Sequence, residues 1–256
     1  MTAVIDLNAD AGEGFGAYAI GADAEMLDSV TSLNVACGFH AGDPVVIRQT
    51  IRAAAAAGVS VGAHPGFPDL QGFGRRPMHI APRDLVDMLI YQIGAVAALA
   101  VAEGQRLRHV KAHGALYNVA VNDAALGDAI AEATAAFPGL WLYAMPGSAM
   151  ATAAAKRGVR VAVEAFLDRG YRPDGSLVPR SQPGALLTDP HTVSKRAVSL
   201  ATEGVVVAVD GTRLSLQPQT LCIHSDTPGA GTLAAAARAA LGAAGVRLAP
   251  PVETAR

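Results

Sequence analysis

The stretch S-L-N-V-A-C-G-F-H-A-G-D-P, residues 32–44, decides the fold class. Its apolar beginning predicts a buried strand, and the alanine-rich residues 45–57 that follow have helical spacing. Asp43 followed by Pro44 is a typical helix start, and the two glycines before them allow a tight turn. Taken alone, this stretch indicates a polar loop with a capping aspartate. If the arrangement recurs, it indicates a repeated β/α unit with His40 at the carboxyl end of its strand.

The arrangement does recur along the chain. Apolar runs that predict buried strands occupy residues 4–7, 33–36, 59–63, 107–112, 140–144, 159–163 and 220–223. Helical spacing follows at 45–57, 82–102, 123–136 (with Asn122 as cap), 149–157, 189–202 and from about 231 to about 244, where a short frayed tail begins. Residues 205–216 alternate around Asp-Gly and predict an inserted β-hairpin.

His, Asp, Glu or Lys residues follow at least five of the seven predicted strands. An open sheet gathers its functional groups at one switch point, whereas every strand end of a closed barrel opens on the same mouth. The pattern therefore favours an α/β fold, a TIM-like (β/α) barrel of about seven strands with an inserted hairpin. We expect one domain over residues 1–256.

Composition restricts the class of partner. The 256 residues are 51% hydrophobic and 16% charged, with a formal net charge of −2 and no basic run. Nucleic acid and anionic membrane are therefore poor candidate partners. The sequence lacks a signal-peptide pattern at its start, and its apolar residues 85–101 are interrupted by Asp87 and Gln92. With only two cysteines, a cytoplasmic protein without a membrane span is expected.

The first predicted strand leads into a polar, glycine-rich loop. Asp6, Asn8 and Asp10 have the same parity, so a continuing strand projects them to one side, where they must bind a ligand or one another. Glu13 lies in the loop that follows. Neither a G-x-G-x-x-G fingerprint nor a Walker A motif is present, so ATP would be bound by other means or by another subunit.

The later strand ends supply further charged side chains. Residues 64–76 form a rigid loop with charges of both signs, typical of a loop that faces a substrate. His109 and His113 have H-x3-H spacing, but on a strand they lie ~13 Å apart, too far for one ion. Lys111 has the same parity as these histidines and is expected to point to the interior, where it needs a carboxylate or an anionic substrate as partner. Residues 164–180 form another long loop of mixed charge.

Several of these motifs together resemble the LamB/YcsF family, which provides one of the subunits of prokaryotic 5-oxoprolinase. The segments that carry the resemblance are D-L-N-A-D-A-G-E-G-F-G, N-V-A-C-G-F-H-A-G-D-P, G-A-H-P-G-F-P-D-L-Q-G-F-G-R-R, V-K-A-H-G-A-L-Y-N and H-S-D-T-P-G-A. They run in the family's order from about Ile5 to Ala230; Ala112 stands where proline is expected and Ser225 where glycine is expected. The resemblance implies a glycoside hydrolase/deacetylase-like barrel and ATP-dependent opening of 5-oxoproline to glutamate. It also implies that the chain is the A component of the enzyme, with two partner subunits, B and C, and magnesium with the nucleotide.

These observations give a candidate site. The residues expected to be catalytic are Asp6, Asp10, Glu13, His64, Lys111, His113 and Glu164. The residues expected to bind substrate are Asn8, Asn34, His40, Arg75, Arg76, Arg169 and His224. His113 and His64 are the candidates for acid/base work. No metal or tightly bound cofactor is expected beyond ATP as co-substrate; a metal, if bound, would be held by Asp10, His40 and His64.

Two other functions remain open. The chain fits a metal-dependent hydrolase of the deacetylase type, because several carboxylates and imidazoles are expected to meet at one mouth of the barrel. It also fits a non-catalytic component that presents 5-oxoproline to its partners. A homo-oligomer is compatible with each of these functions.

Overall fold

The computed structural model describes residues 3–251. By its internal contacts the chain divides into two compact units. Unit 1 comprises residues 3–9, 22–31 and 163–251 of the described chain, and unit 2 comprises residues 10–21 and 32–162. The expectation of one domain over residues 1–256 stays a prediction.

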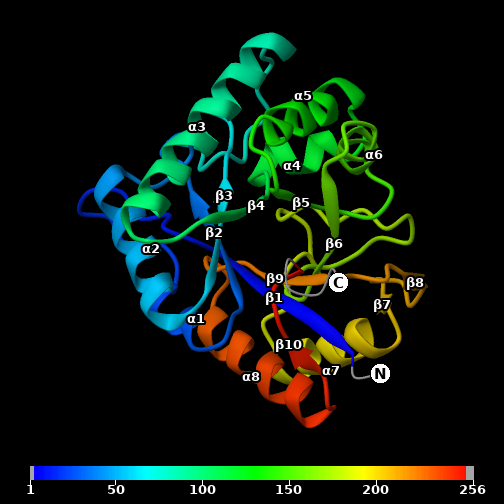
Figure 1. The fold of residues 1–256 in the computed structure, drawn as a ribbon. Coiled ribbons are helices and arrows are strands. Elements are labelled where there is room, and N and C mark those ends of the chain that lie inside the picture. The colour runs from blue at the N-terminus through cyan, green and yellow to red at the C-terminus, as the bar shows by residue number, and fades with distance from the viewer. Residues whose placement is uncertain (1–2, 252–256) are drawn as a thin grey trace. The chain divides into compact units, whose positions relative to one another are not determined.

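Unit 2 is built from consecutive β/α units (Figure 1). Its strands β2 (Ser32–Ala36), β3 (Ser60–His64), β4 (Leu107–Val110) and β5 (Trp141–Ala144) pair in parallel in chain order. Its helices are α2 (Pro44–Ala57), α3 (Pro82–Ala102), α4 (Gly114–Ala120), α5 (Ala124–Ala135) and α6 (Ala149–Lys156). Four of the five helices were predicted. The short helix α4 was not predicted, since its 7 residues are too few to show helical periodicity.

The predicted start of α2 is confirmed, and that of α5 is one residue off. The Asp43 carboxylate accepts hydrogen bonds from the backbone N–H groups of Val45 and Val46 at 2.8 and 3.1 Å. In α5 the cap is Asp123 rather than Asn122. A capping side chain must stand directly before the first helical residue to reach its free N–H groups, and that position belongs to the aspartate.

Helix α3 is long and apolar enough to cross a membrane by length and composition, a test that core helices also pass. One of its faces, which includes Leu89 and Val96, is buried in unit 2. On that face Gln92 is fully buried, and its amide accepts from the backbone N–H of Gly66 and donates to the carbonyl of Gly66, both at 3.0 Å. The apolar face of α3 therefore packs on the sheet, and its one buried amide fixes the loop after β3.

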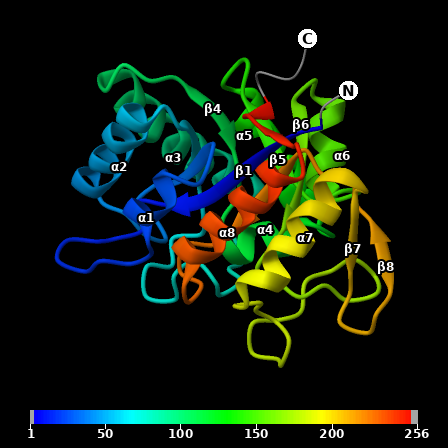
Figure 2. The same ribbon diagram turned by 90° about the horizontal axis from the view of Figure 1, so that it is seen from below.

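Unit 1 contains the first and last strands of the chain. β1 (Val4–Ala11, with residues up to Ala9 in this unit), β6 (Arg160–Phe166, from Val163), β9 (Thr220–Ile223) and β10 (Arg247–Leu248) form parallel pairs, with β1 between β10 and β9. Its helices are α1 (Asp23–Leu27), α7 (Pro190–Thr202) and α8 (Ala230–Ala243). Helices α7 and α8 lie side by side (Figures 1 and 2). The predicted hairpin is confirmed as β7 (Val205–Val207) and β8 (Arg213–Ser215), which pair antiparallel.

The prediction of a frayed tail after residue 244 is wrong for β10. Its residue Arg247 pairs with Val4, which extends the edge of β1. A run of two residues is too short to be predicted as a strand from periodicity. The remainder of the predicted tail, residues 252–256, lies outside the described part of the chain.

The strand order is β10-β1-β2-β3-β4-β5-β6-β9, with a further pairing of β1 and β9. Apart from the two-residue strand β10, this is the hydrogen-bonding order of a closed parallel sheet of seven strands. The predicted TIM-like (β/α) barrel with about seven strands and an inserted hairpin is confirmed. Strand ends in both units carry the polar side chains described next.

Candidate functional site

Asp10 and Lys111 form a buried ion pair in unit 2. The Lys111 ammonium donates to Asp10 Oδ1 at 2.9 Å. The side chain of Asp10 is 5% exposed and that of Lys111 is 3% exposed. The same oxygen accepts a hydrogen bond from the Asn34 amide at 2.8 Å. The sequence predicted that Lys111 needs a carboxylate or an anionic substrate as partner in the interior, and Asp10 is that carboxylate. Because removing a charge from water is costly, each of the two buried charges depends on the other for compensation.

His64 and His113 meet edge to face beside this ion pair. His64 Nδ1 lies 2.7 Å from the carbonyl oxygen of Lys111, and His113 Nε2 lies 2.7 Å from that of Phe73. A carbonyl oxygen only accepts, so each of these ring nitrogens carries the hydrogen. The other two nitrogens, His64 Nε2 and His113 Nδ1, face one another at 3.0 Å. His64 Nε2 also lies 3.4 Å from Asp10 Oδ2.

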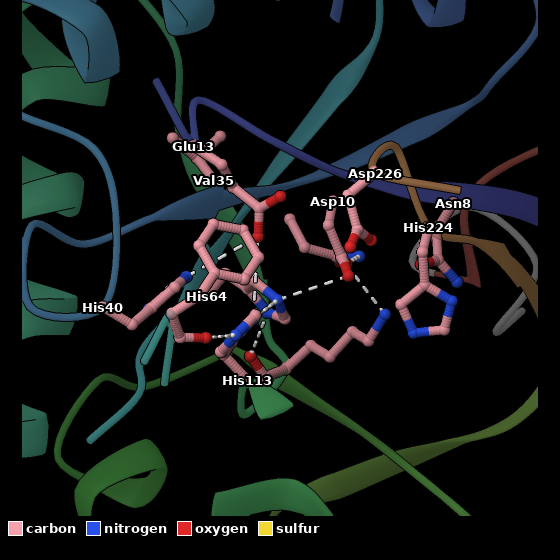
Figure 3. Close-up of polar contacts among 12 residues, drawn as sticks. Asn8, Asp10, Glu13, Val35, His40, His64, His113, His224 and Asp226 are labelled. Carbon is pink, nitrogen blue, oxygen red and sulfur yellow. Dashed lines mark hydrogen bonds and ion pairs between the residues drawn. The ribbon is translucent and has the colours of Figure 1, made fainter. Parts of the chain in front are cut away.

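Glu13 and His40 complete the cluster (Figure 3). Glu13 Oε1 lies 3.6 Å from His113 Nδ1 and 3.7 Å from His40 Nε2. The His40 ring stacks on that of His113, with centroids 3.7 Å apart and planes at 5°. Burial, reinforced by the neighbouring imidazoles, lowers the pKa of His40 and of His113 well below its usual value. Both rings are therefore neutral at pH 7.

Two glycines of the loop that follows β3 make room for these rings. Gly74 has a φ of +63°, and a Cβ there would lie 2.7 Å from both His113 Cδ2 and His40 Cβ. A Cβ on Gly66 would lie 2.8 Å from His40 Nδ1. The loop thus packs its backbone directly on two imidazoles, a close approach that only glycine permits. The rigid loop that was predicted to face a substrate closes over the cluster.

His109 takes a different position from His113. Its Nε2 donates to Asn34 Oδ1 at 2.7 Å, and its ring stacks on Tyr143 with centroids 3.9 Å apart. Burial, together with the Lys111 charge, lowers the pKa of His109 to about 3. His109 therefore orients the Asn34 amide that supports Asp10. The structure thus gives His109 and His113 different hydrogen-bond partners.

Another group of the expected residues meets in unit 1. Asp6 accepts hydrogen bonds from the hydroxyls of Thr31 and Thr220, both at 2.6 Å. The Asn8 amide donates to the Thr220 hydroxyl at 2.7 Å and to Glu164 Oε1 at 3.3 Å. Polar side chains on one side of a buried strand were expected to bind a ligand or one another. In unit 1 Asp6 and Asn8 bind side chains of neighbouring segments and share the Thr220 hydroxyl.

Asp168 is a buried carboxylate that the sequence reasoning missed. It accepts hydrogen bonds from the His224 ring Nδ1 at 3.0 Å and backbone N–H at 3.2 Å, and from the Thr227 hydroxyl at 2.5 Å. Burial alone would raise the pKa of Asp168, but His224 and Thr227 outweigh it and lower that pKa to about 2. The signal in the sequence was its position directly after β6, next to Arg169 in the loop of mixed charge. His224, which also stacks on Phe166, is thus oriented by a carboxylate.

The three arginines expected to bind a substrate carboxylate differ in their contacts. Arg76 pairs with Asp69 of its own loop. Arg169 is buried and donates to the carbonyls of Ala185 and Val178 at 3.2 and 2.7 Å. The Arg75 guanidinium lies 4.9 Å from the centroid of a phenyl ring in the same loop. The guanidinium groups of Arg76 and Arg169 therefore hold loops in place, and binding of substrate by any of the three stays a prediction.

Comparisons with known proteins agree with the motifs. The model of the LamB/YcsF family matches residues 5–256. A protein of Heliobacterium modesticaldum described as the A component of 5-oxoprolinase is 51% identical over 243 residues, 94% of this chain and 96% of that one. One of Kocuria rhizophila with the same description is 52% identical over 244 residues, 95% and 97% of the two chains. The crystal structure of a lactam utilization protein from Thermus thermophilus has a TM-score of 0.91 at 50% identity and covers 96% of this chain and 98% of that one. The resemblance drawn from the motifs is confirmed.

Proposed function

Because the chain belongs to the LamB/YcsF family, we propose that it is the A component of a 5-oxoprolinase, which opens 5-oxoproline to glutamate. Relatives described in these terms are about 50% identical over nearly the full length. The observation that carries the proposal is the buried ion pair of Asp10 and Lys111 beside two imidazoles. Buried carboxylates with such neighbours are typical of catalytic sites.

The reaction needs an activated carbonyl, because a lactam is a poor electrophile. Transfer of the γ-phosphoryl group of ATP to the amide oxygen releases ADP and makes the ring carbon electrophilic. One water then adds to this carbon, the C–N bond breaks, and the nitrogen takes a proton to become the amine of glutamate. A second water releases the phosphate. The sum is one ATP and two waters consumed for one glutamate, one ADP and one phosphate.

Asp10 is the residue we propose as the base that directs the first water. Its Oδ1 is held by Lys111 and Asn34, so the carboxylate has one fixed orientation. Lys111 would stabilise the negative charge that develops at the attacked carbon's oxygen. The acid/base role expected for His64 and His113 stays a prediction, and so do the catalytic roles of the residues in unit 1.

Nucleotide binding is proposed to involve the partner subunits. Because the chain has no Walker A motif, we propose that subunits B and C help to bind ATP. ATP, with its magnesium, is then a co-substrate of the whole assembly. We further propose a cytoplasmic location, where ATP is available.

The experiment that tests the function measures 5-oxoproline-dependent ATP hydrolysis and glutamate release by the chain alone and with the two partner subunits. We expect turnover only in the assembly, and a loss of about 100-fold or more in kcat for Asp10→Asn, the loss typical of a removed base. Asp128→Asn changes an exposed carboxylate and is the matched control. Full turnover by Asp10→Asn in the assembly would refute the assignment of the base. Hydrolysis by the chain alone would refute the dependence on partners.

A further inference from the structure

The ring nitrogens that face each other in the cluster present two lone pairs. His64 and His113 each donate their outer N–H to a backbone carbonyl, which fixes the hydrogen on that side of the ring. The inner nitrogens, 3.0 Å apart, are then both acceptors when the rings are neutral. Two lone pairs at this distance repel unless a cation lies between them. The backbone of unit 2 therefore builds a position for a cation.

Glu13 and His40 contribute two more donor atoms at the same position. One ligand atom from each of Glu13, His40, His64 and His113 lies within 4.8 Å of all the others. In a tetrahedral zinc site with bonds of about 2.0–2.1 Å, ligand atoms are separated by roughly 3.3 Å. The separations of 3.0, 3.6 and 3.7 Å measured among these four side chains fall on both sides of that value. The atoms are thus spaced as the ligands of one ion.

His40 provides an independent indication. Its side chain is fully buried, and within residues 3–251 neither of its ring nitrogens makes a hydrogen bond. A buried imidazole without hydrogen bonds is costly, because both nitrogens lose their contact with water. Figure 3 shows this ring among the other three side chains, with a dashed contact to Glu13. An ion at the cluster would satisfy one of its nitrogens.

We propose that Glu13, His40, His64 and His113 bind one divalent transition-metal ion of the zinc class. Three imidazoles and one carboxylate are ligands that zinc, copper and nickel prefer, whereas magnesium and calcium take oxygen ligands. Ligating histidines usually donate their second ring N–H to a carbonyl or carboxylate, as His64 and His113 do. The site is therefore separate from the magnesium that accompanies a nucleotide.

The charges around the cluster agree with this ligand set. Asp10 is already compensated by the Lys111 ammonium, so Glu13 supplies the negative charge to the ion. Of the three metal ligands expected from the sequence, this set includes His40 and His64. It has Glu13 and His113 in place of Asp10. The His40 and His113 rings are stacked, so the two rings must rotate away from each other for both to bind the ion. His64 and His113 already meet at 89° and form the centre of the site.

This inference is independent of the proposed reaction. With the ion bound, His64 and His113 are ligands rather than acid and base, and the roles proposed for Asp10 and Lys111 are unchanged. Binding is measured without substrate, nucleotide or partner subunits, so its failure and the failure of the proposed function are distinguishable.

The test uses the full chain, stripped of metal by a chelator and then titrated with Co²⁺ and Zn²⁺. We expect one ion per chain, the visible absorption of four-coordinate Co²⁺, its loss on addition of Zn²⁺, and no competition by excess Mg²⁺. His64→Gln and Glu13→Gln should weaken binding by about 100-fold or more. His79→Gln removes an exposed imidazole and should bind as the wild type does. Circular dichroism establishes that each variant is folded.

X-ray absorption at the zinc edge of the wild-type protein gives a second measurement that needs no variant. Imidazole scattering with nitrogen and oxygen neighbours is expected; sulfur neighbours would place the ion elsewhere. A stripped wild-type chain that binds neither Co²⁺ nor Zn²⁺ at micromolar concentration would overturn the proposal. The facing nitrogens would then share a proton. Folded His64→Gln and Glu13→Gln variants with wild-type affinity would overturn it as well.

Discussion

Replacement of Lys111 by methionine should destabilise the protein strongly. The ammonium of Lys111 and the carboxylate of Asp10 are 2.9 Å apart and at most 5% exposed. Removing one partner of a buried ion pair leaves a charge that has lost its compensation, at a cost of about 3–5 kcal/mol. We therefore expect Lys111→Met to lower the free energy of unfolding by about that amount, measured by urea denaturation followed by circular dichroism and by fluorescence of Trp141.

The double variant Asp10→Asn/Lys111→Met measures the coupling energy between the two charges, apart from the interactions of each residue with its surroundings. With both charges removed, the loss should be smaller than the sum of the two single losses by about 2–3 kcal/mol. The control is the exposed pair of Arg157 and Asp128, which has a similar distance of 2.8 Å but side chains 32% and 55% exposed. Its coupling should be at most about 1 kcal/mol. Additive losses for Asp10 and Lys111, within about 0.5 kcal/mol, would refute the reasoning that they compensate each other.

Three further predictions concern other parts of the two units. The pKa of Asp168 is lowered to about 2 in the folded protein, so its carboxylate contributes about 2 kcal/mol to the free energy of unfolding above the unfolded pKa near 4, and this contribution is lost as the pH falls toward 2. Asp168→Asn should flatten that part of the curve of stability against pH. An unchanged curve would contradict the assignment. Gly74→Ala should displace His113 and remove Co²⁺ binding while the chain remains folded by circular dichroism; unchanged binding would show that the loop gives way. Gly62→Ala would place a Cβ 2.2 Å from the His109 ring and should cost about 1–3 kcal/mol of unfolding free energy in urea; a neutral result would mean that the ring moves freely.

The sequence by itself determined the local features of the fold. The alternation of apolar runs and helical spacing predicted seven strands and most helices, because both signals lie within a few neighbouring residues. Asp43 before Pro44 and the alternation around Asp-Gly likewise predicted a cap and a hairpin that are present. Short elements such as α4 and β10 were missed, since they contain too few residues for a period.

The candidate residues were found one by one, but their partners were not. Lys111 was expected in the interior, yet its bond to Asp10 joins side chains 101 positions apart in the chain. Asp168 was overlooked because its importance depends on His224, which is 56 positions away. Such contacts follow from the register of parallel strands and the paths of the loops, which no local pattern encodes.

The tertiary structure alone decided which nitrogens of His64 and His113 carry hydrogen. The sequence places two imidazoles at strand ends, and each imidazole has two possible neutral tautomers. The carbonyls of Lys111 and Phe73 select one tautomer for each ring, because a carbonyl oxygen accepts and never donates. Residue types and spacing thus determined the fold and the candidate side chains, whereas the direction of each lone pair depends on backbone groups brought together only by folding.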